Sequence, residues 1–385
     1  MIYLDNAATS WPKPPSVAEA VAACLTAGGN PGRSGHRKSI EAAGLVEEAR
    51  ELVARLLGAG DPARIAFAPN ATHALNVALY GLLHPGDRVV TTTLEHNAVM
   101  RPLRHLEQQG VEVATVPCSA EGVDLDALEA AVRQGARLVV TTHASNVTGS
   151  VLPIAAIGTI ARRHGVAYLV DAAQTAGVVP IDVDTDAIDL LAFTGHKGLL
   201  GPTGTGGLYV REGIALPPLV RGGTGSDSAR EVQPGFLPDA YEAGTQNVVG
   251  LAGLAAGVRF VLDAGVDRIW QHERTLVSRF VERAAGIPGL VVHGLSSASN
   301  RCGVVSFTLE RMSPSEVGQL LEDSFGILAR VGLHCAPAAH RTIGTSPDGT
   351  VRFSFGWYNT EDEVDAAAEA VRAIAAWSRS TVAAR

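Results

Sequence analysis

Residues 189–198 read DLLAFTGHKG, an apolar run that passes into a short polar loop with two glycines. The run from Asp189 to Phe193 is predicted to be a buried strand, because nearly continuous apolar residues are typical of strands covered on both faces. The loop carries Lys197, one of only three lysines among 31 basic residues, all the others being arginines. An amine can lose its proton and form an imine, whereas a guanidinium stays charged. We therefore expect covalent chemistry at Lys197, and we interpret Lys13 and Lys38 as ordinary surface lysines.

The first two-thirds of the chain alternate apolar runs with helical stretches, such as His73 to Leu83 and Leu125 to Gln134. This alternation predicts an α/β fold with a doubly wound, mostly parallel sheet. The ligand site of such a sheet lies beyond the carboxyl ends of its strands. The other runs expected to be strands are Arg64 to Phe67, Arg88 to Thr92, Arg137 to Thr142 and Ala167 to Val170.

The last third of the chain has the pattern of a smaller α+β unit. We expect a large domain over residues 1–253 and a small C-terminal domain over residues 254–385, with the N-terminal segment packed on the small domain. The elements expected around and after the boundary are a long helical stretch over Asn247 to Ala285, strands over Leu290 to His293 and Gly303 to Leu309, and capped helices that open at Ser313 and Thr360.

Polar residues follow the apolar runs, at the edge where a ligand is expected. Lys197 can hold an aldehyde, Asp171 can meet a protonated pyridine nitrogen, and His96 can stack on a planar ring. Thr72 opens a helix, where free backbone N–H groups attract a phosphate, and Asn146 can donate to a ring oxygen. Each residue alone also suits a cap, a turn or a satisfied carboxylate. Together at one sheet edge they predict a pyridoxal-phosphate site.

Ordered segments along nearly the whole chain carry a recognisable pattern. The segments are Tyr3-Leu4-Asp5-Asn6-Ala7-Ala8-Thr9, Glu95-His96-Asn97, Asn146, Asp171-Ala172-Ala173-Gln174, Thr194-Gly195-His196-Lys197, Gly201-Pro202-Thr203-Gly204, Glu242-Ala243-Gly244-Thr245 and Arg330-Val331-Gly332-Leu333-His334-Cys335-Ala336. In them the chain resembles the fold-type I pyridoxal-phosphate enzymes of the class V aminotransferase group. Within that group it resembles the branch of cysteine desulfurases and selenocysteine lyases.

The resemblance implies a role toward the cofactor, pyridoxal 5'-phosphate, for each matching residue. Lys197 binds it covalently, Asp171 pairs with the ring nitrogen, and His96 stacks on the ring. Asn146 and Gln174 reach the ring hydroxyl oxygen. The residues that hold the phosphate are Ala71 through its backbone, since it stands where a hydroxyl residue is common, then Thr72, Thr194 and His196, and Thr245 from the other subunit of a homodimer.

The resemblance also implies how L-cysteine is held and cleaved. Arg352 clamps the substrate carboxylate beside Asn146, and His36 lies near the partner subunit's active site. Lys197 takes the Cα proton as general base. The Cys335 thiolate attacks the substrate sulfur, which leaves alanine and a persulfide on Cys335. The persulfide sulfur then passes to an acceptor, such as a scaffold or relay protein for iron–sulfur cluster assembly.

Cys335 differs from the other cysteines in having several basic residues near it in the sequence. His334, His340 and Arg330 surround it in sequence, so we expect positive charge from imidazolium and guanidinium groups to favour its thiolate. A zinc site of His334, Cys335 and His340 is an alternative, but it lacks a fourth ligand and a recognised spacing, so no metal site is predicted. The cysteines interpreted as small buried hydrophobes are Cys24, Cys118 and Cys302.

Three other functions stay open from the sequence. A selenocysteine lyase, acting on L-selenocysteine, would share every motif. Another class V reaction, such as transamination, epimerisation or C–S lysis, would not need Cys335. A cofactor-binding regulator would bind the cofactor with slow or absent turnover.

Composition bounds the partners and the compartment. The 385 residues are 46% hydrophobic and 18% charged, which suits a soluble enzyme with sizeable cores. A net charge of −8 argues against nucleic acid or an anionic membrane as the main partner. No apolar run is long enough for a bilayer, and the start has no signal-peptide pattern. With four scattered cysteines and no CxxC pair, these features predict a reducing cytoplasm.

Overall fold

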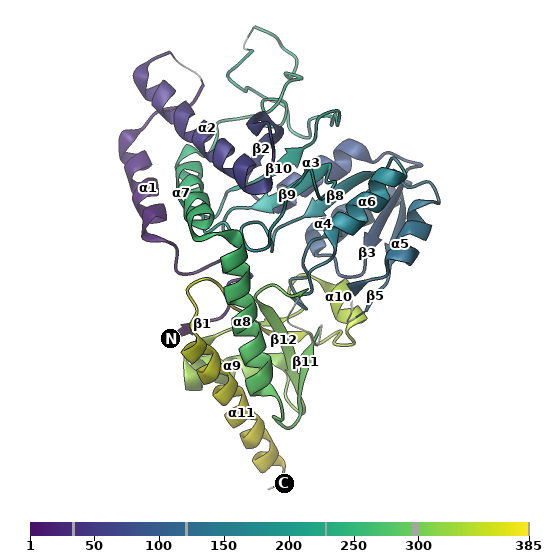
Figure 1. Cartoon of the computed structure of the whole chain (residues 1–385), viewed down its shortest axis with the longest axis vertical. Coiled ribbons are helices and arrows are strands. Elements are labelled where there is room, and N and C mark those ends of the chain that lie inside the picture. Colours follow the sequence, from purple (N-terminus) through teal and green to yellow (C-terminus); the bar gives the residue numbers. More distant parts are fainter. Residues whose placement is uncertain (33–34, 120–121, 228, 295–299, 384–385) are drawn as a thin grey trace.

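The computed structural model describes residues 1–32, 35–119, 122–227, 229–294 and 300–383. Within them, a seven-stranded sheet with the order β2-β10-β9-β8-β7-β3-β4 forms the centre (Figure 1). Its neighbouring strands are parallel except at β10, which runs antiparallel to both neighbours, so the expected mostly parallel α/β sheet is confirmed. The strands are β2 Ile65–Ala68, β3 Arg88–Thr92, β4 Glu112–Val116, β7 Leu138–Thr142, β8 Ala167–Asp171, β9 Leu190–Thr194 and β10 Gly206–Val210.

Helices cover both faces of this sheet. Because side chains alternate across a strand, each face presents apolar side chains that pack against helices. In β7, Leu138 and Val140 pack in one apolar cluster with α3 and α4, whereas Val139 packs in another with α2, α5, α6 and α7. The helices are α1 Pro15–Ala27, α2 Arg37–Leu57, α3 Ala71–Leu82, α4 Asn97–Gln108, α5 Leu125–Val132, α6 Ile154–Arg163 and α7 Val248–Ala264.

Two strands of the central sheet, β4 and β10, are not among those expected from the sequence. β4 has an exposed end at Glu112, and β10 begins with two glycines, so neither has the continuous apolar run of a central strand. A Cβ atom on Gly206 would lie 2.6 Å from the carbonyl oxygen of Phe193 and 2.8 Å from the Cα of Asn70. The glycine therefore allows the N-terminus of α3 to approach the sheet closely.

A second sheet with the order β11-β12-β15-β14 is antiparallel throughout. Its core includes Phe280, Phe307 and Phe353, with ring centroids 5.0 to 5.9 Å apart. Leu4 is fully buried in this core, and β1 pairs with β13 nearby. The elements here are β1 Ile2–Tyr3, α8 Val266–Ala284, β11 Leu290–His293, β12 Val304–Leu309, α9 Pro314–Phe325, β13 Ile327–Leu328, β14 Arg330–Gly332, α10 Pro337–Thr342, β15 Thr350–Ser354 and α11 Glu361–Ala383. Among the described residues, three short elements remain: η1 Pro62–Arg64, β5 Cys118–Ser119 and β6 Gly122–Val123.

The prediction of one long helical stretch over residues 247–285 is wrong in one respect, because the segment forms two helices. α7 and α8 meet at Gly265, whose φ of 86° cannot continue a helix, and they are bent by 80°. Residue 253 lies inside α7, and the division of the chain into domains at this point stays a prediction. No single helix in the described ranges is long and apolar enough to cross a membrane; α7 and α8 pass that test only as a bent pair.

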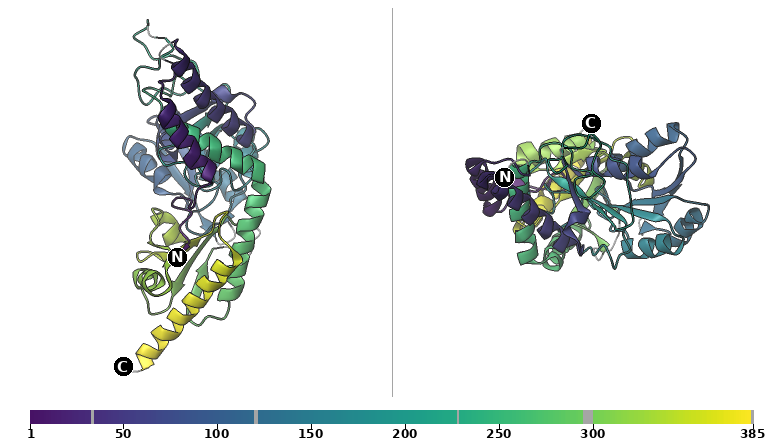
Figure 2. Two further views of the ribbon diagram at one scale, coloured as in Figure 1. Left: turned by 90° about the vertical axis from the view of Figure 1, so that its left-hand side faces the viewer. Right: turned by 90° about the horizontal axis from the view of Figure 1, so that it is seen from above.

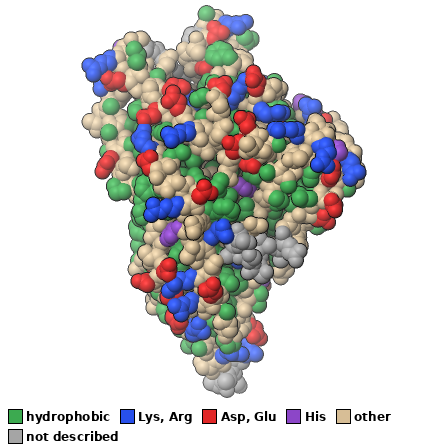
Figure 3. All heavy atoms as spheres, in the orientation of Figure 1, with side chains coloured by type: hydrophobic (Ala, Val, Ile, Leu, Met, Phe, Trp, Pro, Cys, Tyr) green, Lys and Arg blue, Asp and Glu red, His purple; other side chains and the backbone are tan. Residues whose placement is uncertain are grey.

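The expected caps of α9 and α11 are present. Ser313 and Glu316 form a capping box at α9, and Thr360 and Glu363 exchange the same pair of contacts at α11. The molecule is elongated, with α11 projecting at the end opposite α1 and α2 (Figure 2). On the face shown in Figure 3, charged side chains of both signs are interspersed.

Candidate active site

A pocket with about 500 Å³ of empty space opens where the loops after β3, β7, β8 and β9 meet the first turn of α3. We call it the lysine pocket. It lies at the carboxyl edge of the parallel strands, where doubly wound sheets bind their ligands. The fold brings nine of the residues proposed for the cofactor to its lining: Ala71, Thr72, His96, Asn146, Asp171, Gln174, Thr194, His196 and Lys197.

Lys197 lies in the loop that follows β9. Its carbonyl oxygen accepts from Ser10 Oγ and from the N–H of Leu200, both at 2.9 Å. Desolvation lowers the pKa of the Lys197 ammonium to about 8; the charge of Asp171 opposes this shift and that of Arg352 adds to it. About a tenth of the side chain is therefore neutral amine at pH 7, far more than for an ordinary lysine, and the neutral amine is the form that attacks an aldehyde.

Asp171 is the last residue of β8 and is only 3% exposed. Its Oδ1 accepts one hydrogen bond, at 2.9 Å, from the N–H of Ala173. Burial raises the pKa of this carboxyl, while the Lys197 ammonium lowers it. A buried carboxylate with so little compensation favours a cation beside it, such as a protonated ring nitrogen.

Glu95 is a buried residue to which the sequence alone gave no role. Its carboxyl accepts from Thr92 Oγ1 at 2.6 Å and from the N–H of Thr142 at 2.8 Å, so it joins the ends of β3 and β7. Desolvation raises its pKa to about 8, and the charge of Asp171 adds to the shift. Glu95 is therefore mostly uncharged at neutral pH. Only the fold shows that this side chain points inward.

His96 caps the N-terminus of α4. Its Nδ1 accepts from the N–H of Ala98 at 3.0 Å, which places the ring proton on Nε2. Desolvation, followed by the charges of Lys197 and Arg330, lowers the pKa of His96 to about 4. The ring is therefore neutral, held by its own helix, and lines the lysine pocket.

The first turn of α3 also lines the lysine pocket. Asn70 caps the helix through its side chain, which accepts from the N–H of His73 at 2.9 Å, and leaves the N-terminal amides of Ala71 and Thr72 at the pocket. His196 Nδ1 is buried there without a partner in the described structure, and desolvation lowers the pKa of that ring to about 4. These donors and the helix terminus suit a phosphate.

Two arginines approach the lysine pocket from the second sheet. Arg330 of β14 and Arg352 of β15 are directly paired across the strands. Arg352 is 1% exposed; its Nη2 donates to Asp5 Oδ1 at 2.7 Å and its Nη1 to the carbonyl oxygen of Asn146 at 3.2 Å. Its Nε is buried without a partner in the described structure, as is the Oδ1 of Asn146. An oriented guanidinium with a free donor suits a carboxylate.

Cys335 lies on a turn that we call the cysteine loop, residues 333–336. The N–H of Asn97, in the first turn of α4, donates to the carbonyl oxygen of Cys335 at 2.8 Å. Asn146 Nδ2 donates to the carbonyl oxygen of His334 at 2.7 Å. His334 and Cys335 have φ values of 48° and 58°, in the left-handed region that costs side-chain-bearing residues roughly 1–2 kcal/mol each. The loop is thus anchored by its main chain to the rim of the lysine pocket, and the Cys335 side chain is exposed.

The expectation of an imidazolium beside Cys335 is wrong. Desolvation, and then the charge of Arg352, lower the pKa of His334 to about 2; desolvation also lowers that of His340 to about 4. Their hydroxyl partners are Thr350 Oγ1 at 3.0 Å and Thr345 Oγ1 at 2.7 Å. Both rings are therefore neutral packing groups. Among the described residues, no three His, Cys, Asp or Glu side chains are placed to hold a metal ion.

The other three cysteines, Cys24, Cys118 and Cys302, are buried, as expected. Four predicted site residues do not line the lysine pocket; Arg352 and Cys335 lie next to it through their contacts with Asn146 and Asn97, whereas Thr245 and His36 lie elsewhere. Thr245 lines a separate pocket beside the turn that precedes α3. His36 is exposed and caps α2, where its Nδ1 accepts from the N–H of Ser39 at 3.2 Å. Glu242, in the same motif as Thr245, forms a buried ion pair with Arg50 at 2.7 Å. This pair secures the segment of Glu242 and Thr245 to α2.

The interpretation of Lys13 as an ordinary surface lysine is also wrong. Its ammonium is partly buried and donates to the carbonyl oxygen of His196 and to Ser10 Oγ, both at 2.7 Å. Lys38, by contrast, is largely exposed and lies 3.8 Å from Glu41.

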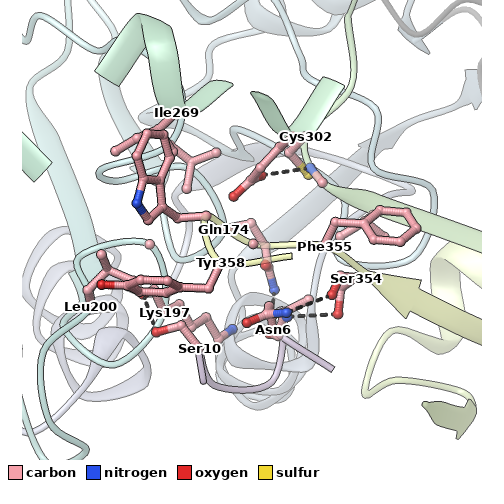
Figure 4. A pocket seen from close by; sticks show the side chains of 18 of the residues that line it. Asn6, Ser10, Gln174, Lys197, Leu200, Ile269, Cys302, Ser354, Phe355 and Tyr358 are labelled. Atoms are coloured by element: carbon pink, nitrogen blue, oxygen red, sulfur yellow. Dashed lines mark hydrogen bonds between the residues drawn. The ribbon is translucent and has the colours of Figure 1, made fainter. Parts of the chain in front are cut away.

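A second pocket, of about 580 Å³, adjoins Lys197 on the side of the N-terminal segment and the second sheet (Figure 4). It shares Gln174 and Lys197 with the lysine pocket. Asn6 crosses to the second sheet, donating to the carbonyl oxygen of Ser354 at 3.0 Å. Residues from the start of the chain therefore lie between the two sheets and support the loop after β9 that carries Lys197, residues 195–198, which we call the lysine loop.

The sequence matches the family model described as Aminotransferase class-V over residues 2–367. A protein of Methanothermobacter thermautotrophicus named probable cysteine desulfurase is 36% identical over 385 residues, covering 97% of this chain and 94% of that protein. A protein of Pyrococcus abyssi with the same name is also 36% identical, over 379 residues, with 95% and 92% covered.

Solved structures agree with these sequence relatives. The apo cysteine desulfurase from Thermococcus onnurineus superposes with a TM-score of 0.90 at 35% identity, covering 97% of this chain and 94% of that one. The cysteine desulfurase CsdA from Escherichia coli gives 0.84 at 33% identity, with 96% and 93% covered. The expected fold class is confirmed.

Proposed function

The chain belongs to the aminotransferase class V family, and on this premise we propose that the lysine pocket and Cys335 together convert L-cysteine to L-alanine, leaving a persulfide on Cys335. The enzyme is a pyridoxal-phosphate-dependent cysteine desulfurase. The assignment of roles to individual residues is our proposal, supported by their placement around one pocket.

The lysine pocket fits pyridoxal phosphate. Asp171 is a buried carboxylate that lacks a strong partner, and the Oδ1 of Asn146 and Nδ1 of His196 are buried without partners in the described structure. We propose that Asp171 meets the ring nitrogen, His96 the ring face, and Asn146 and Gln174 the ring hydroxyl. The residues proposed for the phosphate are Ala71 and Thr72 at the α3 terminus, Thr194 and His196.

When bound, pyridoxal phosphate supplies an aldehyde for covalent attachment and an electron sink for the substrate carbons. Lys197 would hold the aldehyde through Nζ, and the same atom would take the Cα proton of the substrate, which a pKa near 8 permits. Arg352, held in place by Asp5, and Arg330 beside it bind the substrate carboxylate.

Cys335 performs the sulfur transfer. Its thiolate attacks the Sγ of L-cysteine, so the S–S bond forms while the Cβ–S bond breaks and its electron pair stays with Cβ. Cβ then takes a proton, and the products are L-alanine and one persulfide, which balances the atoms without an added oxidant. The observation that carries this proposal is the attachment of the cysteine loop to Asn146, which lines the lysine pocket, and to Asn97, whose neighbours His96 and Ala98 line it.

Assembly and sulfur delivery extend the proposal. Because Thr245 lies apart from the lysine pocket of its own chain, it serves best in the site of a second copy, and with His36 it supports a homodimer. The exposed Cys335 can hand its sulfur to an acceptor protein, such as a scaffold for iron–sulfur cluster assembly. Four unpaired cysteines suit a reducing cytoplasm.

The test is a paired assay of alanine release and persulfide formation with L-cysteine. Cys335→Ser should lose both, because a serine hydroxyl stays protonated and is a poor nucleophile toward sulfur. Cys24→Ser, a buried cysteine on α1, is the matched control and should keep both. Normal alanine release by Cys335→Ser would reject the proposed sulfur transfer and favour a thiol-independent class V reaction.

A further inference from the structure

Lys13 directs its ammonium at the main chain of the lysine loop. Its Nζ lies 2.7 Å from the carbonyl oxygen of His196 and 2.7 Å from Ser10 Oγ. Ser10 Oγ in turn donates to the carbonyl oxygen of Lys197 at 2.9 Å. One ammonium therefore reaches both peptide carbonyls that flank the Cα of Lys197, one directly and one through a hydroxyl.

Other donors of the N-terminal segment converge on the same carbonyl of His196. They are the N–H of Ser10 at 3.1 Å, the hydroxyl of Thr9 at 3.1 Å and the hydroxyl of Ser10 at 3.3 Å, which lies closer to the Lys197 carbonyl. Figure 4 shows Ser10 beside Lys197, joined to it by a hydrogen bond. Since a carbonyl oxygen has two lone pairs, this concentration of donors fixes its direction.

The position is costly for a cation. Within the described residues, Lys13 makes no ion pair with a carboxylate, and desolvation alone lowers its pKa to about 8. Burying an unpaired ammonium is unfavourable unless its donors are satisfied. The chain uses arginine at nearly every other basic position, yet keeps a compact ammonium here. A guanidinium presents its donors in a rigid fork, whereas an ammonium can serve two acceptors that lie close together.

We propose that Lys13 is a positioning residue that fixes the main chain of Lys197, so that the lysine amine meets the aldehyde of the cofactor in a single orientation. The inference rests on the proposed function, since it concerns attachment of pyridoxal phosphate at Lys197. The amine must approach the aldehyde in a defined geometry, and misplacement by about 1 Å can slow a reaction on the order of 100-fold.

Loss of Lys13 should leave the rest of the N-terminal segment in place. β1 stays paired with β13, and Asn6 keeps its contact with Ser354, neither of which involves Lys13. A Lys13→Met variant therefore tests the contact to the lysine loop rather than the docking of the whole segment.

The experiment adds pyridoxal phosphate to apoenzyme and follows covalent attachment at Lys197 by absorbance and by peptide mapping after borohydride reduction. Lys13→Met should slow attachment roughly tenfold or more, with an unchanged melting temperature. Hydrogen exchange should quicken at the amide of Leu200, which donates to the Lys197 carbonyl, and not in the central strands. Lys38→Met is the control and should match wild type, because Lys38 is exposed on α2.

Attachment at the wild-type rate in folded Lys13→Met would overturn the inference. If that variant does not fold, Ser10→Ala decides, because it removes the hydroxyl relay without removing a charge; slow attachment supports the inference and wild-type attachment overturns it. Failure of the wild-type apoenzyme to attach pyridoxal phosphate at Lys197 would reject the proposed function itself, which is a separate result.

Discussion

The lysine pocket and the cysteine loop are built in opposite ways. Asp171 ends β8 and Lys197 lies in the loop after β9, and desolvation shifts the pKa of both. Cys335 lies on a turn of left-handed backbone beyond the second sheet, and its thiol is exposed. The pocket is fixed by packed strand ends, whereas the loop is fixed by two hydrogen bonds to its main chain.

This difference matches the two tasks in the proposed reaction. Proton transfer at the substrate Cα needs groups whose charge is controlled, which burial provides. Delivery of sulfur to another molecule needs a thiol that both the substrate and an acceptor can reach. The hydrogen bonds from Asn97 and Asn146 hold the Cys335 thiol close to the buried groups that transfer the proton.

The largest effect should come from the pocket lysine. Lys197→Ala should abolish covalent attachment of pyridoxal phosphate and turnover of cysteine, because no other described amine lines the lysine pocket. Borohydride reduction followed by peptide mapping checks this. Lys38→Ala, which changes an exposed lysine, should behave as wild type. A reduced adduct on Lys13 or Lys38 would show that the pocket has been assigned to the wrong lysine.

A smaller loss is expected at the buried carboxylate. Asp171→Asn keeps the shape of the side chain but cannot balance a protonated ring nitrogen. Loss of one partner of a buried charge pair costs about 3 kcal/mol, on the order of 100-fold in kcat/KM. Steady-state alanine release measures it. Retention of near-normal turnover, with the cofactor bound, would remove Asp171 from the proposed role.

The smallest effect concerns the stability of the protein at acid pH, to which His334 in the cysteine loop contributes. His334 is neutral when folded, with a pKa of about 2 against 6.5 when unfolded, so the unfolded chain binds more protons below pH 6.5. Stability should therefore fall as the pH drops below 6.5, by up to about 1.4 kcal/mol per pH unit from this residue. Urea unfolding of His334→Gln between pH 7.5 and 5 should show a shallower loss than wild type, while His84→Gln, an exposed control, should not. Equal slopes for His334→Gln and wild type would contradict this account.

Much of the lysine pocket could be predicted from the sequence, because its residues directly follow apolar strands and strand ends meet at one edge of a parallel sheet. Asp171, at the end of β8, and Lys197, in the loop after β9, both lie at this edge. β10 could not be predicted in the same way, because its glycines serve close packing rather than a turn. The sequence gives Glu95 no role and misplaces Lys13 at the surface for another reason: only the fold shows which polar side chains turn inward.

The cysteine loop was less accessible to sequence reasoning. Its motif indicated a reactive thiol, but neighbours in sequence were mistaken for charged neighbours. His334 and His340 pack inward and stay neutral, because burial disfavours the imidazolium form. Charge next to a residue in sequence does not imply charge next to it in space.

The most direct test of the central claim is the site of persulfide formation. Wild-type holoenzyme is treated briefly with L-cysteine, its thiols are alkylated, and the peptides are analysed by mass spectrometry. The account predicts one additional sulfur atom on the peptide that contains Cys335, and none on those that contain the buried Cys24, Cys118 and Cys302. Alanine released at the normal rate while the Cys335 peptide stays unmodified would contradict it.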